Sequence, residues 1–198
     1  MYMYFRFSEP SIVLLSTDKS NNMKLTKTIS LPPNMMVDNI SPFYNGSFVL
    51  STYAHNKPVR IVDVNGNYTF FNGIAFPKSQ YDVDKCQCAF IASHNILAFT
   101  DYDESIVCLF NTQTGESVKV TDPQVNRPRG VSKGPNDSIL VCCYASIVQL
   151  TPRGEVLTSV DVGMCNLQAI SVSKDFTQLA VSSTSRQDCQ LRLFKILK

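Results

Sequence analysis

One unit of the chain reads PRGVSKGPNDSILVCCYASIVQLTPRGEVLTSV and spans residues 128–160. Within it, the turn Asn136-Asp137 precedes the apolar run Ile139–Cys142, and a Pro-Arg-Gly turn separates Ser146–Leu150 from Val156–Val160. Asparagine, aspartate, proline and glycine between β-rich runs are the residues that close β-hairpins. The unit therefore predicts four short strands joined by tight turns.

The third strand of this unit recurs along the chain. Similar apolar segments have Ile12, Val59, Ile106, Ile147 and Leu191 as their second residues, 41–47 residues apart. Four strands repeated every ~40 to 45 residues are typical of a β-propeller, whose neighbouring blades cover both apolar faces of each sheet. No stretch keeps a helical apolar period over three turns, so we predict an all-β fold. The alternative is an ordinary antiparallel sandwich of meander hairpins.

The same unit resembles the NHL repeat, whose pattern opens with Pro-x-Gly-Val and ends with Ile-x-x-Phe/Leu-x-x-x-Gly. Pro128–Val131 and Ile147–Gly154 fit these two parts. The chain is similar in particular to the C-terminal propeller of tripartite-motif (TRIM-NHL) proteins of invertebrates, and Ser171–Ser183 resembles the last blade of that group. The similarity is good from about Cys86 onward and weaker before it. The short connection Tyr144-Ala145 departs from the family, whose members carry Asn and Asp there.

The strands predict a single β-propeller segment over residues 1–198, with about four and a half four-stranded blades. The expected full blades are 38–78, 86–122 and 128–162, and the expected partial blades are 1–31 and 167–197. Because the resembled family builds six blades, we expect an incomplete six-bladed ring, an open arc that lacks one or two N-terminal blades. Its open edges predict self-association. The alternative is a compact four-bladed ring in which residues 23–31 pair beside Leu191 and Leu193.

The resemblance implies a non-catalytic recognition domain, similar to the substrate-recognition propeller of TRIM-type ubiquitin ligases. The ligase itself needs zinc-binding RING and B-box modules, with Cys/His sets at spacings such as Cys-x2-Cys. Cys86-Gln-Cys88 and Cys142-Cys143 do not have this spacing, and the chain contains only two histidines. We therefore predict no enzyme activity, no catalytic residue, no cofactor and no metal site. An NHL propeller that binds RNA in post-transcriptional regulation is the alternative, and a propeller lyase or lactonase is disfavoured.

The expected ligand face is formed by the loops between second and third strands and by the connections between units. Basic and acidic residues nearly balance there, which favours a protein or peptide over RNA, because RNA binding depends on neutralising phosphates. Tyrosine and arginine are the usual anchors of protein interfaces. The candidate partner-binding residues are Tyr53, Lys57, Tyr102, Arg127, Arg129, Tyr144 and Arg186.

Composition sets the remaining expectations. The net charge of +2 indicates no nucleic-acid or membrane partner by itself. Seven cysteines in a chain that begins without a secretory signal predict reduced thiols and a cytoplasmic location. Val141, Ile147 and Leu150 are expected in the core of the best-formed blade.

Overall fold

The computed structural model describes residues 2–5, 10–18, 22–54, 56–78, 80–184 and 189–196, with the backbone alone for 2–5 and Thr17. The described residues form five small antiparallel sheets. The first sheet contains β1 (Tyr2–Phe5), β2 (Ser11–Thr17) and β3 (Met23–Ser30). The second contains β4 (Val37–Pro42), β5 (Phe48–Thr52), β6 (Val59–Val62) and β7 (Tyr68–Thr69).

The other three sheets follow the same up-and-down order. The third contains β8 (Cys88–Ile91), β9 (Ile96–Asp101), β10 (Ile106–Asn111) and β11 (Ser117–Val120). The fourth contains β12 (Val131–Lys133), β13 (Ile139–Cys142), β14 (Ser146–Leu150) and β15 (Val156–Asp161). The fifth contains β16 (Leu167–Val172), β17 (Gln178–Thr184) and β18 (Cys189–Lys195). Short 3-10 turns, η1 (Tyr44–Gly46), η2 (Ala92–His94) and η3 (Pro135–Asp137), join the first two strands of the full sheets.

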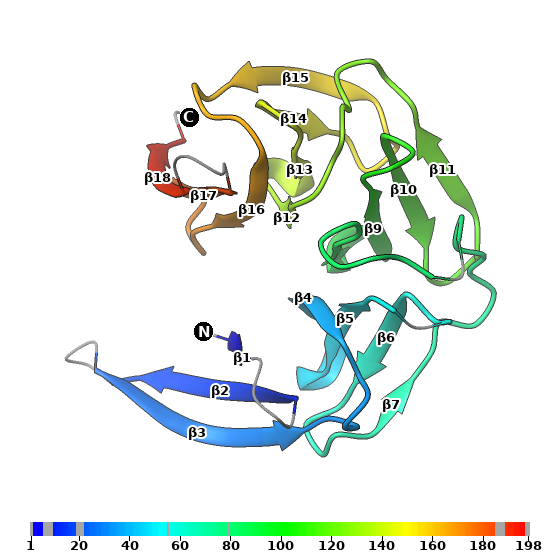
Figure 1. The fold of residues 1–198 in the computed structure, drawn as a ribbon, viewed down its shortest axis with the longest axis vertical. Helices are drawn as coiled ribbons and strands as arrows, with labels where there is room; N and C mark the ends of the chain where they lie inside the picture. The colour runs from blue at the N-terminus through cyan, green and yellow to red at the C-terminus, as the bar shows by residue number, and fades with distance from the viewer. Residues whose placement is uncertain are drawn as a thin grey trace.

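The sheets stand side by side around a common axis (Figure 1). Their innermost strands contact one another in chain order, β1 with β4, β4 with β8, β8 with β12, and β12 with β16. This arrangement is a β-propeller. The first and fifth sheets lie at the two ends of the arc, and no strand pairing joins them within the described parts of the chain. The compact four-bladed ring is wrong, because β3 pairs with β2 in the first sheet and does not pair with β18 of the fifth sheet.

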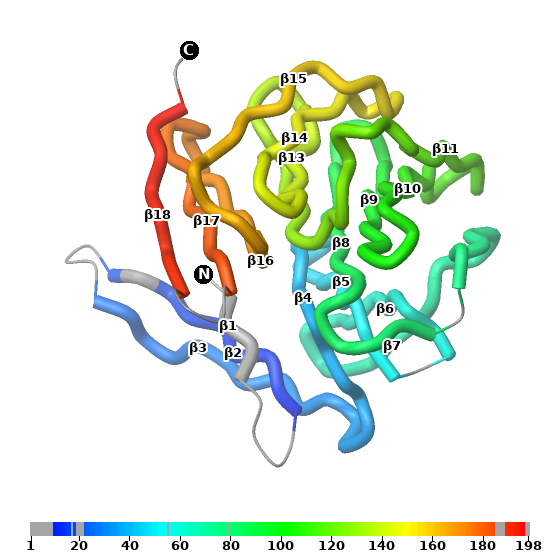
Figure 2. The backbone as a smooth tube through the Cα atoms, turned by 45° about the horizontal axis from the view of Figure 1, so that its top comes forward, coloured from blue at the N-terminus to red at the C-terminus, as the bar shows by residue number. Residues whose placement is uncertain are grey.

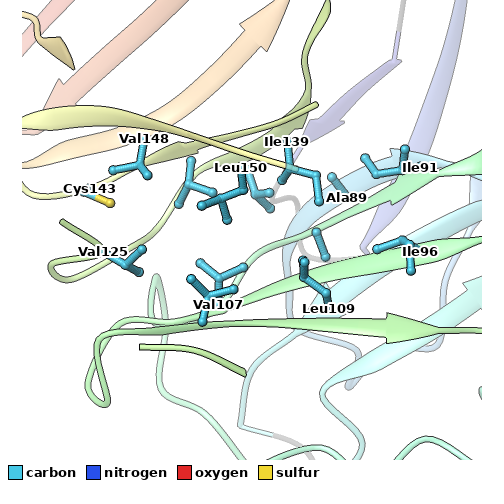
Figure 3. Close-up of a cluster of buried hydrophobic side chains, with 14 residues drawn as sticks. Ala89, Ile91, Ile96, Val107, Leu109, Val125, Ile139, Cys143, Val148 and Leu150 are labelled. Atoms are coloured by element: carbon cyan, nitrogen blue, oxygen red, sulfur yellow. The ribbon is translucent and has the colours of Figure 1, made fainter. Parts of the chain in front are cut away.

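A separate apolar cluster fills each interface between neighbouring sheets. The cluster between the third and fourth sheets includes Val107, Leu109, Ile139 and Leu150 (Figure 3). Sheet faces are covered on both sides in the middle of the arc, so all five residues from Ile106 to Phe110 are buried in β10. A strand without a solvent face can be continuously apolar, as the sequence indicated.

The predicted core of the fourth sheet is confirmed. Val141 and Leu150 are fully buried, and Ile147 is 7% exposed. Close approach between sheets also explains Gly130, since a Cβ added there would lie 2.9 Å from the Cα of Ala169 on β16. At the ends of the arc the outer faces are open, and Leu191 and Leu193 of β18 are 71% and 72% exposed.

The first sheet (β1–β3) and the fifth sheet (β16–β18) flank the open interval of the arc (Figures 1 and 2). Among the described residues, no helix is long and apolar enough to cross a membrane.

Candidate functional site

One end of the arc carries the loops that join second to third strands and the connections between sheets. We call this end the loop face; its described residues are 31–36, 53–54, 56–58, 70–78, 80–87, 101–105, 121–130, 143–145 and 162–166. Because every sheet has the same strand order, these segments gather at one end of the axis. The described candidate residues from the sequence are all on it, while Arg186 lies outside the described residues.

Three basic side chains surround the ring of Tyr102 on the loop face. The Nζ atom of Lys85 lies 4.0 Å from the ring centroid, and the Cζ atoms of Arg129 and Arg127 lie 4.5 Å and 5.9 Å from it. All three distances are within the range of cation–π attraction. Lys85 also pairs with Asp103 at 3.0 Å. We call Lys85, Tyr102, Arg127 and Arg129 the Tyr102 cluster.

Backbone hydrogen bonds from three segments hold the Tyr102 cluster in place. The N–H of Tyr102 donates to the carbonyl of Lys85 at 3.0 Å, and the N–H of Arg129 donates to the carbonyl of Cys142 at 2.9 Å. Arg127 has a left-handed backbone (φ 49°), and its N–H donates to the hydroxyl of Ser105 at 3.2 Å. The cluster therefore depends on the packing of the third sheet against the fourth.

A buried ion pair supports the loop that carries Tyr102. Asp101 is fully buried, and its Oδ1 accepts hydrogen bonds from Lys78 Nζ at 3.3 Å and from the N–H of Glu104 at 3.1 Å. Tyr81 packs nearby, and burial, followed by the charge of Asp101, raises the pKa of its hydroxyl. The phenol therefore stays protonated at neutral pH. The buried ion pair and its hydrogen bonds hold the loop that carries Tyr102 in place.

A belt of polar side chains crosses the axis beneath the Tyr102 cluster. Asn39 Nδ2 lies 3.5 Å from Gln87 Oε1, and Gln87 Nε2 donates to the carbonyl of Gln168 at 3.3 Å. Arg129 donates from its guanidinium to Gln168 Oε1. These four residues, which we call the polar belt, come from the starts of the first strands of four sheets. Their guanidinium, amide and carbonyl groups give the loop face a polar floor.

The remaining candidate residues do not join the Tyr102 cluster. Tyr144 is 41% exposed, and its N–H donates to the carbonyl of Asn126 at 2.9 Å, which places it beside the segment that carries Arg127. Tyr53 is only 8% exposed and offers little surface to a partner. Lys57 lies in the same loop as Tyr53, with its Nζ atom 5.6 Å from the ring centroid of Phe70. Sequence reasoning thus selected Tyr102, Arg127 and Arg129, but it did not select Lys85 or the other residues of the polar belt, Asn39, Gln87 and Gln168.

Histidine and cysteine are the side chains that most often supply metal ligands and reactive nucleophiles. No group of three or more His, Cys, Asp or Glu side chains that could hold a metal occurs among them. His94 lies in η2, at the opposite end of the axis from the loop face, while His55 is outside the described residues. Burial raises the pKa of Cys108 to about 11 and that of Cys143 to about 12, so both thiols stay protonated and unreactive.

Comparison with known proteins supports the fold. No protein-family model and no curated protein matches the chain by sequence. Among solved structures, the nidogen/laminin complex matches with a TM-score of 0.70 and 12% identity, over 96% of this chain and 73% of the other. A streptogramin B lyase matches with a TM-score of 0.58 and 13% identity, over 100% of this chain and 68% of the other. Virginiamycin B lyase from Staphylococcus aureus matches with a TM-score of 0.59 and 18% identity, over 96% of this chain and 63% of the other.

These similarities define a class and no more. The chain is a β-propeller protein, since it shares its arrangement of sheets with both a propeller-containing complex and propeller lyases. It spans between 46% and 73% of the length of such structures. At these identities the likeness concerns the fold, and an enzyme and a binding domain are both represented among the similar structures.

Proposed function

We propose that this propeller is a non-catalytic recognition domain that binds an acidic segment of a protein partner on its loop face. The observation that carries the proposal is the Tyr102 cluster, in which three cations lie within 6 Å of one aromatic ring. Arginine and tyrosine are enriched among the residues that dominate binding energy at protein interfaces. A carboxylate approaching Tyr102 meets the exposed guanidinium of Arg127 and the half-buried one of Arg129.

The geometry of the cluster favours a carboxylate for a physical reason. Arg129 is held by Gln168 below and by the Tyr102 ring beside it, so its guanidinium loses little freedom when a ligand binds. A fixed guanidinium donates strong charge-assisted hydrogen bonds to a carboxylate. The propeller of the nidogen/laminin complex offers a parallel for protein binding by this fold. Further parts of the proposal come from the resemblance to TRIM-NHL propellers: substrate recognition in ubiquitination, and a cytoplasmic location.

RNA is the competing ligand, because aromatic and arginine side chains also stack on bases. Two features of the cluster favour protein. Asp103 forms an ion pair with Lys85, and the nearby Glu104 and Asp101 both form ion pairs with Lys78. The positive charge is therefore confined to a small area. Strong RNA binding needs many phosphate contacts along a basic surface.

Fluorescence anisotropy at physiological salt tests the proposal. The probes are a labelled peptide of alternating Glu and Gly, the same peptide with Gln for Glu, and a labelled oligouridine of similar length. We expect the Glu peptide to bind and the double variant Arg127→Ala, Arg129→Ala to weaken it roughly tenfold, since exposed ion pairs contribute up to about 1 kcal/mol each. The matched control is Lys24→Ala, Lys27→Ala, which removes two exposed lysines from β3.

Each result has a clear meaning. Equal binding of the Glu and Gln peptides, or loss of binding in the control alone, contradicts the proposed carboxylate site. Tight, sequence-selective RNA binding that the double variant abolishes overturns the preference for a protein partner. Elemental analysis and a ubiquitin-discharge assay address the enzymatic alternatives, and we expect no stoichiometric zinc and no discharge from a charged conjugating enzyme.

A further inference from the structure

A cavity of about 520 Å³ lies on the axis at the end opposite the loop face. Its wall is formed by the innermost strands β4, β8, β12 and β16, which surround the axis in Figures 1 and 2. Apolar side chains dominate the lining and include Ile40, Phe43, Phe90, Val131 and Ile170. Small-molecule sites typically enclose 300–1,000 Å³ and are mostly apolar with a few placed polar groups. The cavity has this size and character.

The strands that line the cavity also offer hydrogen bonds to a ligand. Each of β4, β8, β12 and β16 is the edge strand of its sheet, so one side of each carries backbone groups without a strand partner. One such group shows how they are satisfied: the N–H of Phe90 on β8 donates to the hydroxyl of Ser41 on β4 at 3.1 Å. Ser132, Ser171 and Ser173 add further hydroxyl groups to the lining.

The charged residues among those that line the cavity are both lysines. Lys133 lies 2.5 Å from Asp137, measured between Nζ and Oδ1, and is therefore partly neutralised. Lys174 is exposed and has no ion pair among the described residues. A cavity with an apolar body and a lysine at its rim has the complementary charge for an anionic group.

Phe176 at the rim of the cavity has an unfavourable backbone conformation. Its φ is 56°, in the left-handed region that a bulky side chain rarely adopts. In the turn between β8 and β9, the matching position is Asn95 with the same φ of 56°, and both N–H groups close the same kind of turn, to Ala92 and to Ser173. Asparagine tolerates this conformation well, whereas phenylalanine is strained there. Strain of this kind is found at ligand sites, where a side chain has a use besides folding.

We infer that the axial cavity binds a small organic anion with an aromatic or aliphatic body, with Lys174 facing the anionic group and Phe176 covering the apolar part. The site is distinct from the loop face, because the polar belt of Asn39, Gln87, Arg129 and Gln168 crosses the axis between the two ends. Ligand binding at the cavity and partner binding at the Tyr102 cluster therefore use different residues.

Isothermal titration calorimetry with 2-naphthoate and its uncharged analogue 2-naphthamide tests the inference. We expect naphthoate to bind about tenfold more tightly than naphthamide, and Lys174→Ala to remove that preference without weakening naphthamide. The matched control is Lys24→Ala, an exposed lysine of β3 away from the cavity, which should change neither affinity. Leu193→Ser, on the open face of β18, should also leave both unchanged, which excludes binding to that apolar surface.

The variant Phe176→Asn gives an independent result. We expect it to weaken both probes several-fold while the melting temperature stays the same or rises, because asparagine relieves the strained backbone. Absence of naphthoate binding up to its solubility limit contradicts the inference. So does equal affinity for the two probes, or an unchanged preference in Lys174→Ala.

Discussion

The packing of neighbouring sheets predicts a large loss of stability for one leucine-to-alanine substitution and almost none for another. Leu150 is fully buried between the third and fourth sheets, whereas Leu193 on β18 is 72% exposed. Leu150→Ala loses the transfer free energy of the removed atoms and leaves a cavity between two packed sheets. We therefore expect a loss of about 3 to 4 kcal/mol in the free energy of unfolding. Leu193→Ala removes little buried surface and should cost less than about 0.5 kcal/mol.

Urea denaturation of the wild type and both variants, followed by circular dichroism, measures this difference. The slope of the unfolding free energy against urea concentration should be unchanged, so that the shift in the midpoint reports stability alone. A neutral Leu150→Ala would falsify the pairing of β14, because a one-residue slip turns every side chain to the other face of the sheet. A large cost for Leu193→Ala contradicts the open outer face of the fifth sheet, and would mean that this face is covered in solution.

Three further predictions concern thiols, acid and a close backbone approach. Of the seven cysteines, Cys165 and Cys189 are exposed and should react rapidly with a thiol reagent in the native protein, while the five buried ones react only on unfolding. Hydrogen bonds, from Lys133 to Asp137 and from Ser173 to Asp175, lower the pKa of both carboxyl groups. Their contribution to stability is therefore present above the unfolded pKa and is lost as the pH falls through the lower folded pKa. The melting temperature should drop as the pH falls below about 4, and should drop less in the double variant Asp137→Asn, Asp175→Asn. Gly130→Ala should destabilise the protein by about 1 to 3 kcal/mol in the same urea assay, because the new Cβ meets the backbone of β16; a neutral result contradicts the close contact between the fourth and fifth sheets.

The repeat in the sequence was sufficient to predict the class of fold. Recurring Ile-Val segments and Asn- or Gly-containing turns are local signals, and they mark the strands that the structure contains. The signal weakens where the strand itself is short, as at β7, which has only two residues, Tyr68 and Thr69.

The candidate site was harder to predict because it depends on contacts between sheets. The sequence could place Tyr102, Arg127 and Arg129 on one face, since all three lie in loops of the same type. It gave no sign that Lys85 stacks on the same ring, or that Tyr53 is buried, because both depend on side-chain packing in long connections. The polar belt did leave a signal that was missed: polar residues stand in or just before the first strands of four sheets, at Asn39, Gln87, Arg129 and Gln168.

The proposed loop-face function is tested most directly by capturing partners from cell lysate with the immobilised chain, with and without RNase. The capture uses the wild type, the double variant Arg127→Ala, Arg129→Ala and the control Lys24→Ala, Lys27→Ala. We predict that the wild type and the control retain a specific protein after RNase treatment, and that the double variant loses it. Capture that RNase abolishes, or that the double variant retains in full, would contradict recognition of a protein partner by the Tyr102 cluster.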